Sequence, residues 1–147
     1  MVYDSGNLIE KTVMEDFKTA PYFNASNYDT ELDSRSKKKR LEVEAISVSQ
    51  IGDQTFIHVV LERVSGVVSF EVTDLDKVSV KDYANTRDFS EVIKGDATLE
   101  CIVLVKVDDV VNAKDLVVVS NEVSGEIAIY QIDKETKTYN IVANHTK

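Results

Sequence analysis

Residues 97–107 read Ala-Thr-Leu-Glu-Cys-Ile-Val-Leu-Val-Lys-Val and carry the strongest strand signal in the chain. Apolar residues recur at every second position, as they do where a β-strand buries one face. This face comprises Leu99, Cys101, Val103, Val105 and Val107. We expect it to lie in a core, with Cys101 serving as a small buried hydrophobic residue.

Shorter runs of the same kind lie on both sides of this stretch. They span residues 41–48, 55–64, 67–73, 78–80, 116–119, 127–132 and 139–143, with turn residues such as Gly52-Asp53 and Ser65-Gly66 between them. Valine, which suits a pleated half-buried surface, occurs 23 times in 147 residues. No run is followed by a helix long enough for a parallel crossover, so the pattern predicts an antiparallel sandwich or barrel.

Two runs have features of their own. The alternation of Leu41, Val43 and Ala45 slips by one residue at Ile46, which predicts a β-bulge. The run 55–64 is apolar on both faces and reads as a central strand, with His58 in its middle. We interpret His58 as a packed or surface-facing strand residue rather than as a ligand.

The first 40 residues differ from the rest. Asn7 and Glu10 are spaced as a capping box, and Ile9, Val13 and Phe17 form one stripe of a short helix. Pro21 is expected to end this helix. Residues 24–40 are polar without a period. We therefore predict an N-terminal helix and polar linker over 1–40 and the β-domain over 41–147.

Charge limits the possible partners. The net charge is −9, and residues 41–147 hold ten basic and nineteen acidic side chains. Such an acidic surface repels phosphate and argues against nucleic acid. One basic run interrupts it, best read as a solvated linker and alternatively as a contact for single-stranded DNA. It comprises Arg35, Lys37, Lys38, Lys39 and Arg40.

Patterns of catalysis and metal binding are missing from the sequence. There is no nucleophile elbow, no glycine-rich phosphate loop, and one cysteine with two distant histidines. A hydrolase would need two carboxylates in one cleft, and no pair stands out. Acidic turns at Asp74 and Asp76 and at Asp108 and Asp109 leave calcium open as a weak alternative. We expect no catalytic residues, no cofactor, no metal and no membrane span.

Residues 41–132 resemble an immunoglobulin-like sandwich domain of unknown function found in Gram-positive and mycobacterial secreted proteins and lipoproteins. The resemblance rests on residues 41–46, 56–61, Ser69-Phe70 with Asp74, 94–107 and 115–119. Lys94 stands where that family has proline, and residues 63–66 replace an asparagine-rich segment. The resemblance implies an all-β, antiparallel immunoglobulin-like sandwich of about seven or eight strands, an exported location, and a binding or structural role without catalytic residues.

A second, shorter resemblance is to accessory proteins of conjugative elements that touch single-stranded DNA. Residues 28–43, 76–78 and 107–110 carry it. The acidity of residues 41–147 opposes such a role.

Together these observations predict a non-enzymatic interaction or structural module of the bacterial cell surface, which binds a protein or envelope partner. The alternative is an intracellular accessory protein of a mobile element. If a leader preceded Met1, the module is extracellular or held at the cell surface; otherwise it is cytoplasmic.

Overall fold

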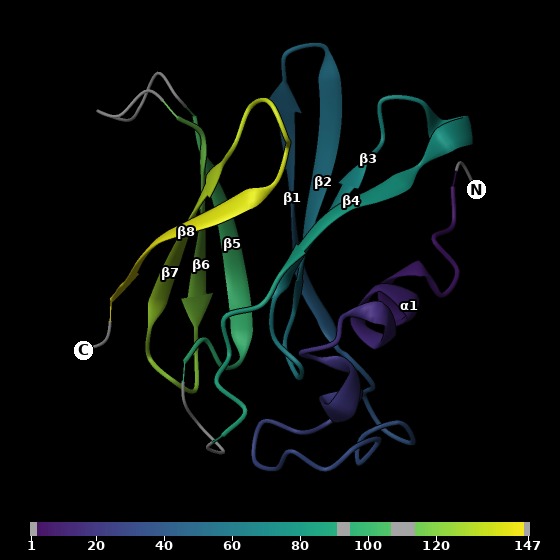
Figure 1. Ribbon diagram of the computed structural model, residues 1–147, viewed down its shortest axis with the longest axis vertical. Coiled ribbons are helices and arrows are strands. Elements are labelled where there is room, and N and C mark those ends of the chain that lie inside the picture. The colour runs from purple at the N-terminus through teal and green to yellow at the C-terminus, as the bar shows by residue number, and fades with distance from the viewer. Residues whose placement is uncertain (1–2, 91–94, 107–113, 146–147) are drawn as a thin grey trace.

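The computed structural model describes residues 3–90, 95–106 and 114–145. Within these residues, two four-stranded antiparallel sheets pack against each other, and a short N-terminal helix lies on the far side of the first sheet (Figure 1). The predicted all-β sandwich with a short N-terminal helix is confirmed. No helix in the described part of the chain is long and apolar enough to cross a membrane.

Each sheet is a meander in which every strand pairs with the next one in sequence. All eight predicted runs form strands. Sheet A comprises β1 (Val43–Ile51), β2 (Gln54–Leu61), β3 (Val67–Glu71) and β4 (Ser79–Ala84), and sheet B comprises β5 (Leu99–Val105), β6 (Leu116–Asn121), β7 (Ile127–Ile132) and β8 (Tyr139–His145). This sequential order differs from the immunoglobulin domain, whose strands are joined as a Greek key.

The core between the sheets is built from alternate residues of the facing strands. Phe56 and Val60 of β2 point inward from sheet A, and Val117, Val119 and Tyr130 point inward from sheet B. All five are at most 1% exposed. Alternation of this kind is what lets a sequence with a period of two bury one face of each sheet.

Two strands carry irregular registers. In β1 the register shifts between Val43 and Ala45, which confirms the predicted bulge. In β5 it also shifts, between Leu99 and Cys101. Leu99 is fully buried, whereas Cys101 is exposed and Val103 is 58% exposed.

The predicted inward face of residues 97–107 is therefore wrong beyond Leu99. One extra residue in a strand exchanges the two faces downstream. Ile102 and Leu104 pack on the core instead. Val107, Asp108 and Asp109 lie outside the described residues, as do Val92, Ile93 and Lys94.

The described residues before β1 (3–42), which we call the N-terminal layer, pack against part of the outer face of sheet A (Figure 1). Helix α1 (Leu8–Glu15) buries Val13 completely in a cluster with Val59, Val68 and Phe70. A short 3-10 helix, η1 (Ala20–Tyr22), follows it. A second 3-10 helix, η2 (Leu75–Lys77), joins β3 to β4.

The ends of α1 differ from the prediction. Asn7 occupies the N-cap without a side-chain hydrogen bond, so no capping box forms there. The helix stops before Pro21, because Oδ1 of Asp16 accepts hydrogen bonds from the N–H groups of Lys18 and Thr19, at 3.0 and 2.9 Å. Phe17 consequently leaves the apolar stripe and is 92% exposed.

Residues 24–27, expected in the polar linker, are buried. The Nδ2 group of Asn24 donates to Oγ of Ser36 at 2.7 Å, and Nδ2 of Asn27 donates to Oε1 of Glu62 at 3.1 Å. These bonds satisfy the two amide nitrogens that burial removes from water, whereas the Oδ1 atoms of the same side chains are buried without a hydrogen-bond partner among the described residues. The division of the chain at residue 40 stays a prediction.

Candidate functional site

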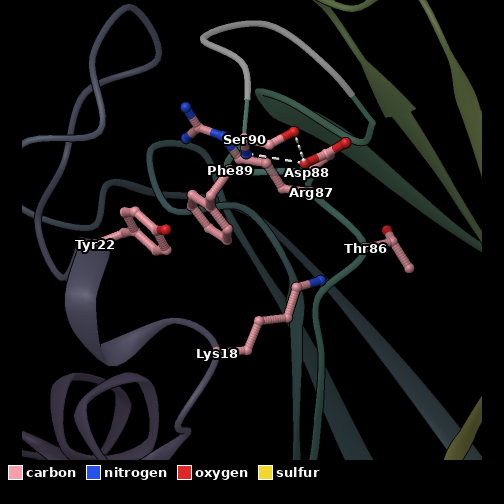
Figure 2. Close-up of a pocket in the computed structure, with 7 residues that line it drawn as sticks. All are labelled: Lys18, Tyr22, Thr86, Arg87, Asp88, Phe89 and Ser90. Carbon is pink, nitrogen blue, oxygen red and sulfur yellow. Dashed lines mark hydrogen bonds between the residues drawn. The ribbon is translucent and has the colours of Figure 1, made fainter.

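A hollow of about 410 Å³ opens between the N-terminal layer and the segment that follows β4. Figure 2 shows the side chains around it. They are Lys18, Tyr22, Thr86, Arg87, Asp88, Phe89 and Ser90. The rim is polar, since the Ser90 hydroxyl donates to the Asp88 carboxylate at 2.6 Å.

Two aromatic rings meet across the boundary between these segments. Tyr22 of η1 and Phe89 are stacked, with ring centroids 4.2 Å apart and planes within 1° of parallel (Figure 2). The guanidinium carbon of Arg87 lies 5.0 Å from the Phe89 centroid, within range of a cation–π contact. The stack therefore joins the N-terminal layer to the chain after β4.

Arg87 fixes the same junction with hydrogen bonds. It is fully buried, and its Nη1 and Nη2 groups donate to the carbonyls of Arg63 at 2.6 Å and Ser26 at 3.2 Å. Burial lowers the pKa of Arg87, although Asp29 opposes this effect. Nζ of Lys18 donates to the carbonyl of Asn85 at 2.8 Å. Both cations beside the hollow thus bind backbone carbonyls of the fold.

Asp96 is the centre of a second buried polar group, which joins the 85–98 segment to sheet B. It is 1% exposed; Nδ2 of Asn121 donates to its Oδ1 at 2.8 Å, and the hydroxyl of Thr86 donates to its Oδ2. The hydroxyl of Tyr130 lies 3.5 Å from the same Oδ2. Burial raises the pKa of Asp96, while these hydrogen bonds oppose the shift.

His58 lies between the two sheets. Its Nε2 is hydrogen-bonded to Oγ of Ser49 on β1 at 2.7 Å, and its Nδ1 to the hydroxyl of Tyr139 on β8. Burial, assisted by the positive charge of Lys106, lowers the pKa of His58 to about 4. A neutral imidazole therefore bridges the sheets, while Cys101 is exposed on sheet B.

Three carboxylates gather where β1 meets the end of β2. Oxygens of Glu42, Glu44 and Glu62 lie within 4.8 Å of one another. Cations of the protein already neutralise two of them: Nε of Arg63 lies 2.5 Å from Glu42, and Nη1 of Arg63 lies 2.9 Å from Glu62. Lys39 also pairs with Glu42. A metal ion would have to displace these contacts.

The pKa values of Glu42 and Glu62 are shifted in opposite directions. Burial raises the pKa of Glu62 to about 7, and its hydrogen bond to Glu42 adds to this rise. Burial acts in the same direction on Glu42, but hydrogen bonds from Lys39, Glu62 and Arg63 outweigh it and lower the pKa to about 2. At neutral pH Glu42 is therefore ionised, whereas Glu62 takes up a proton as the pH falls through about 7.

The basic run lies in the turns that precede β1. Lys37, Lys38 and Arg40 are exposed, Arg35 is half-buried, and Lys39 binds Glu42. Among the candidate calcium residues, Asp74 accepts a hydrogen bond from the N–H of Asp76 at 3.0 Å and pairs with Lys77 at 3.2 Å. Local turn structure accounts for both contacts.

One large surface of the fold carries only uncharged side chains. We call it the open face: the outward side of β5, β6 and β7, where cross-strand pairs form three rows. The rows are Cys101, Ser120 and Ile127; Val103, Val118 and Ile129; and Val105, Leu116 and Gln131. None of these nine residues is charged. A sheet face in contact with water ordinarily carries polar residues, so this face is unusual.

Comparison with known proteins gives one match. The model of a family described as the choice-of-anchor I domain matches residues 1–75, just over half of the 147-residue chain. This region includes the N-terminal layer and the first three strands of sheet A. No curated protein and no solved structure matches the chain.

Proposed function

We propose that this chain, which belongs to the choice-of-anchor I domain family, is a non-enzymatic interaction module of the bacterial cell surface that binds a protein partner through its open face. The family match favours a module associated with the cell surface. It gives no support to the alternative of an accessory protein contacting single-stranded DNA through Arg35 to Arg40.

The open face is the observation that carries the proposal. Val103 and Ile127 are 58% and 46% exposed, and their neighbours on the rows are uncharged. Contiguous exposed apolar patches rimmed by polar residues mark interaction sites. Lys114 is an exposed residue before β6, and its Nζ donates to Oε1 of Gln131 at 3.1 Å, so it provides part of such a rim.

The polar interior supports a binding role over a catalytic one. His58, Asp96 and Arg87 each bond to groups on a different layer or segment. A general base must instead reach a proton on a bound substrate. In the described part of the chain, these three side chains hold the layers together.

Protease treatment of intact cells that produce the native protein tests the proposed location. We expect added protease to remove the protein while a cytosolic marker survives, and survival of the protein would contradict the proposal.

The role of the open face is tested with Val103→Asp, matched by Val48→Asp on the outer side of β1, where Val48 is 59% exposed. Only Val103→Asp should release the protein from washed cells.

A further inference from the structure

We propose that the open face binds the open face of a second copy of this chain, giving a symmetric dimer of stacked sheets. The inference rests on the proposed function because it uses the same surface. The partner is a second copy of the chain, because the chain itself offers an uncharged, twisted antiparallel sheet.

The other three sheet faces pack against another layer at their centres. The inner faces of sheets A and B cover each other, with Phe56 and Val60 packed in one cluster with Val117 and Val119. The outer face of sheet A is covered at its centre by α1, where Val13 packs in one cluster with Val68. Ile46 and Val48, on the part of this face formed by β1, stay exposed. Among the described residues, no packed cluster includes the open face.

Charge favours an approach of two copies through their open faces. Each copy carries a net charge of −9, so two copies repel each other in most orientations. The nine positions of the open face carry no charge, and a two-fold axis places this patch against itself. The symmetric arrangement therefore brings no like charges together at its centre. Raising the salt concentration should strengthen the dimer, since salt screens the remaining repulsion.

The size of the open face sets the expected strength of the dimer. Its three strands are six or seven residues long and about 4.8 Å apart, which gives a face of roughly 20 Å by 10–15 Å. The flat area of about 200–300 Å² per copy is around a third of the roughly 800 Å² per partner in a standard stable interface. We therefore expect a reversible dimer that dissociates in the micromolar range rather than an obligate one.

Sedimentation velocity of the full chain from about 1 to 200 µM tests the proposal. The wild type should shift from monomer to dimer across this range. Val103→Asp should raise the dissociation constant at least tenfold, because it places two buried carboxylates at the interface. Val48→Asp makes the same change at a site of equal exposure on sheet A, and its dissociation constant should match the wild type.

Three results would overturn the dimer: a wild type that stays monomeric at 200 µM, equal dissociation constants for the wild type and Val103→Asp, or loss of the dimer in Val48→Asp. If the wild type is monomeric but only Val103→Asp is released from cells, the proposed function stands and its partner is a different protein. If Val103→Asp changes neither the dissociation constant of the dimer nor the release of the protein from washed cells, both proposals fail. Circular dichroism spectra of the two variants verify that each is folded.

Discussion

Replacing Arg87 with alanine is expected to lower the free energy of unfolding by about 3–5 kcal/mol. The change removes both hydrogen bonds to the carbonyls of Arg63 and Ser26 and leaves those oxygens buried. It also empties the space beside the Phe89 ring. Since small domains are stable by only about 5–15 kcal/mol, the variant should be close to unfolding.

Urea denaturation measures this effect, with two variants as controls. Arg87→Met keeps much of the side-chain volume but not the hydrogen bonds, so it should recover about half of the loss. Lys18→Ala removes an exposed donor to the carbonyl of Asn85 beside the same hollow and should cost about 1 kcal/mol or less. Wild-type stability of Arg87→Ala would show that Arg87 does not hold the N-terminal layer in place.

The second large effect is an acid-dependent loss of stability centred on His58. Its pKa is about 4 in the folded state, against 6.5 for an ordinary histidine side chain in water. Between these values the unfolded chain binds the proton more tightly, so the stability contributed by neutral His58 is present above pH 6.5 and is lost as the pH falls toward 4. The full loss amounts to about 3 kcal/mol at 1.36 kcal/mol per pKa unit.

Glu62 opposes this trend over part of the same range. Its pKa is raised from 4.5 to about 7, so the folded state binds the proton more tightly. Its contribution is therefore present below pH 4.5 and is lost as the pH rises through 7. The two slopes partly cancel in the wild type between pH 4.5 and 6.5.

Comparing variants with the wild type at each pH separates the two groups. Glu62→Gln should lose the contribution of Glu62, so its stability relative to wild type rises from pH 4.5 to 7. His58→Gln should lose acid sensitivity, so its relative stability rises as the pH falls from 6.5 to 4. Urea titrations at half-unit steps of pH give both curves. If the free energy of unfolding depended on pH in the same way for the wild type and His58→Gln, His58 would be exposed to water in the folded state.

The eight strands were predictable from sequence because alternation is a local signal. The two faces of β5 were not, since the register shift between Leu99 and Cys101 depends on pairing with β6. The same 1-residue ambiguity was readable in β1, where the apolar phase itself slips between Ala45 and Ile46. Between Cys101 and Val105 both phases are apolar, and the charged Glu100 and Lys106 marked the wrong face as the outer one.

The buried hydrogen bonds of Arg87 and Asp96 could not be predicted from the sequence for a different reason. Arg87 bonds to residues 24 and 61 positions earlier in the chain, and Asp96 to one 25 positions later. Their neighbours in sequence give no periodic signal, because both lie in irregular segments. Their roles depend on contacts between segments that lie far apart in the sequence. The apolar composition of the open face was visible in the sequence, but its exposure was not.

Alkylation of Cys101 in dilute native protein is the most direct test of the account. Cys101 is the chain's one cysteine and lies on the open face. If sheet B turns this face to solvent, the thiol should react within about tenfold of its rate in urea, because no unfolding has to precede the reaction. Protection of about a thousandfold or more, relieved only by global unfolding, would put Cys101 in the core and contradict the orientation of sheet B.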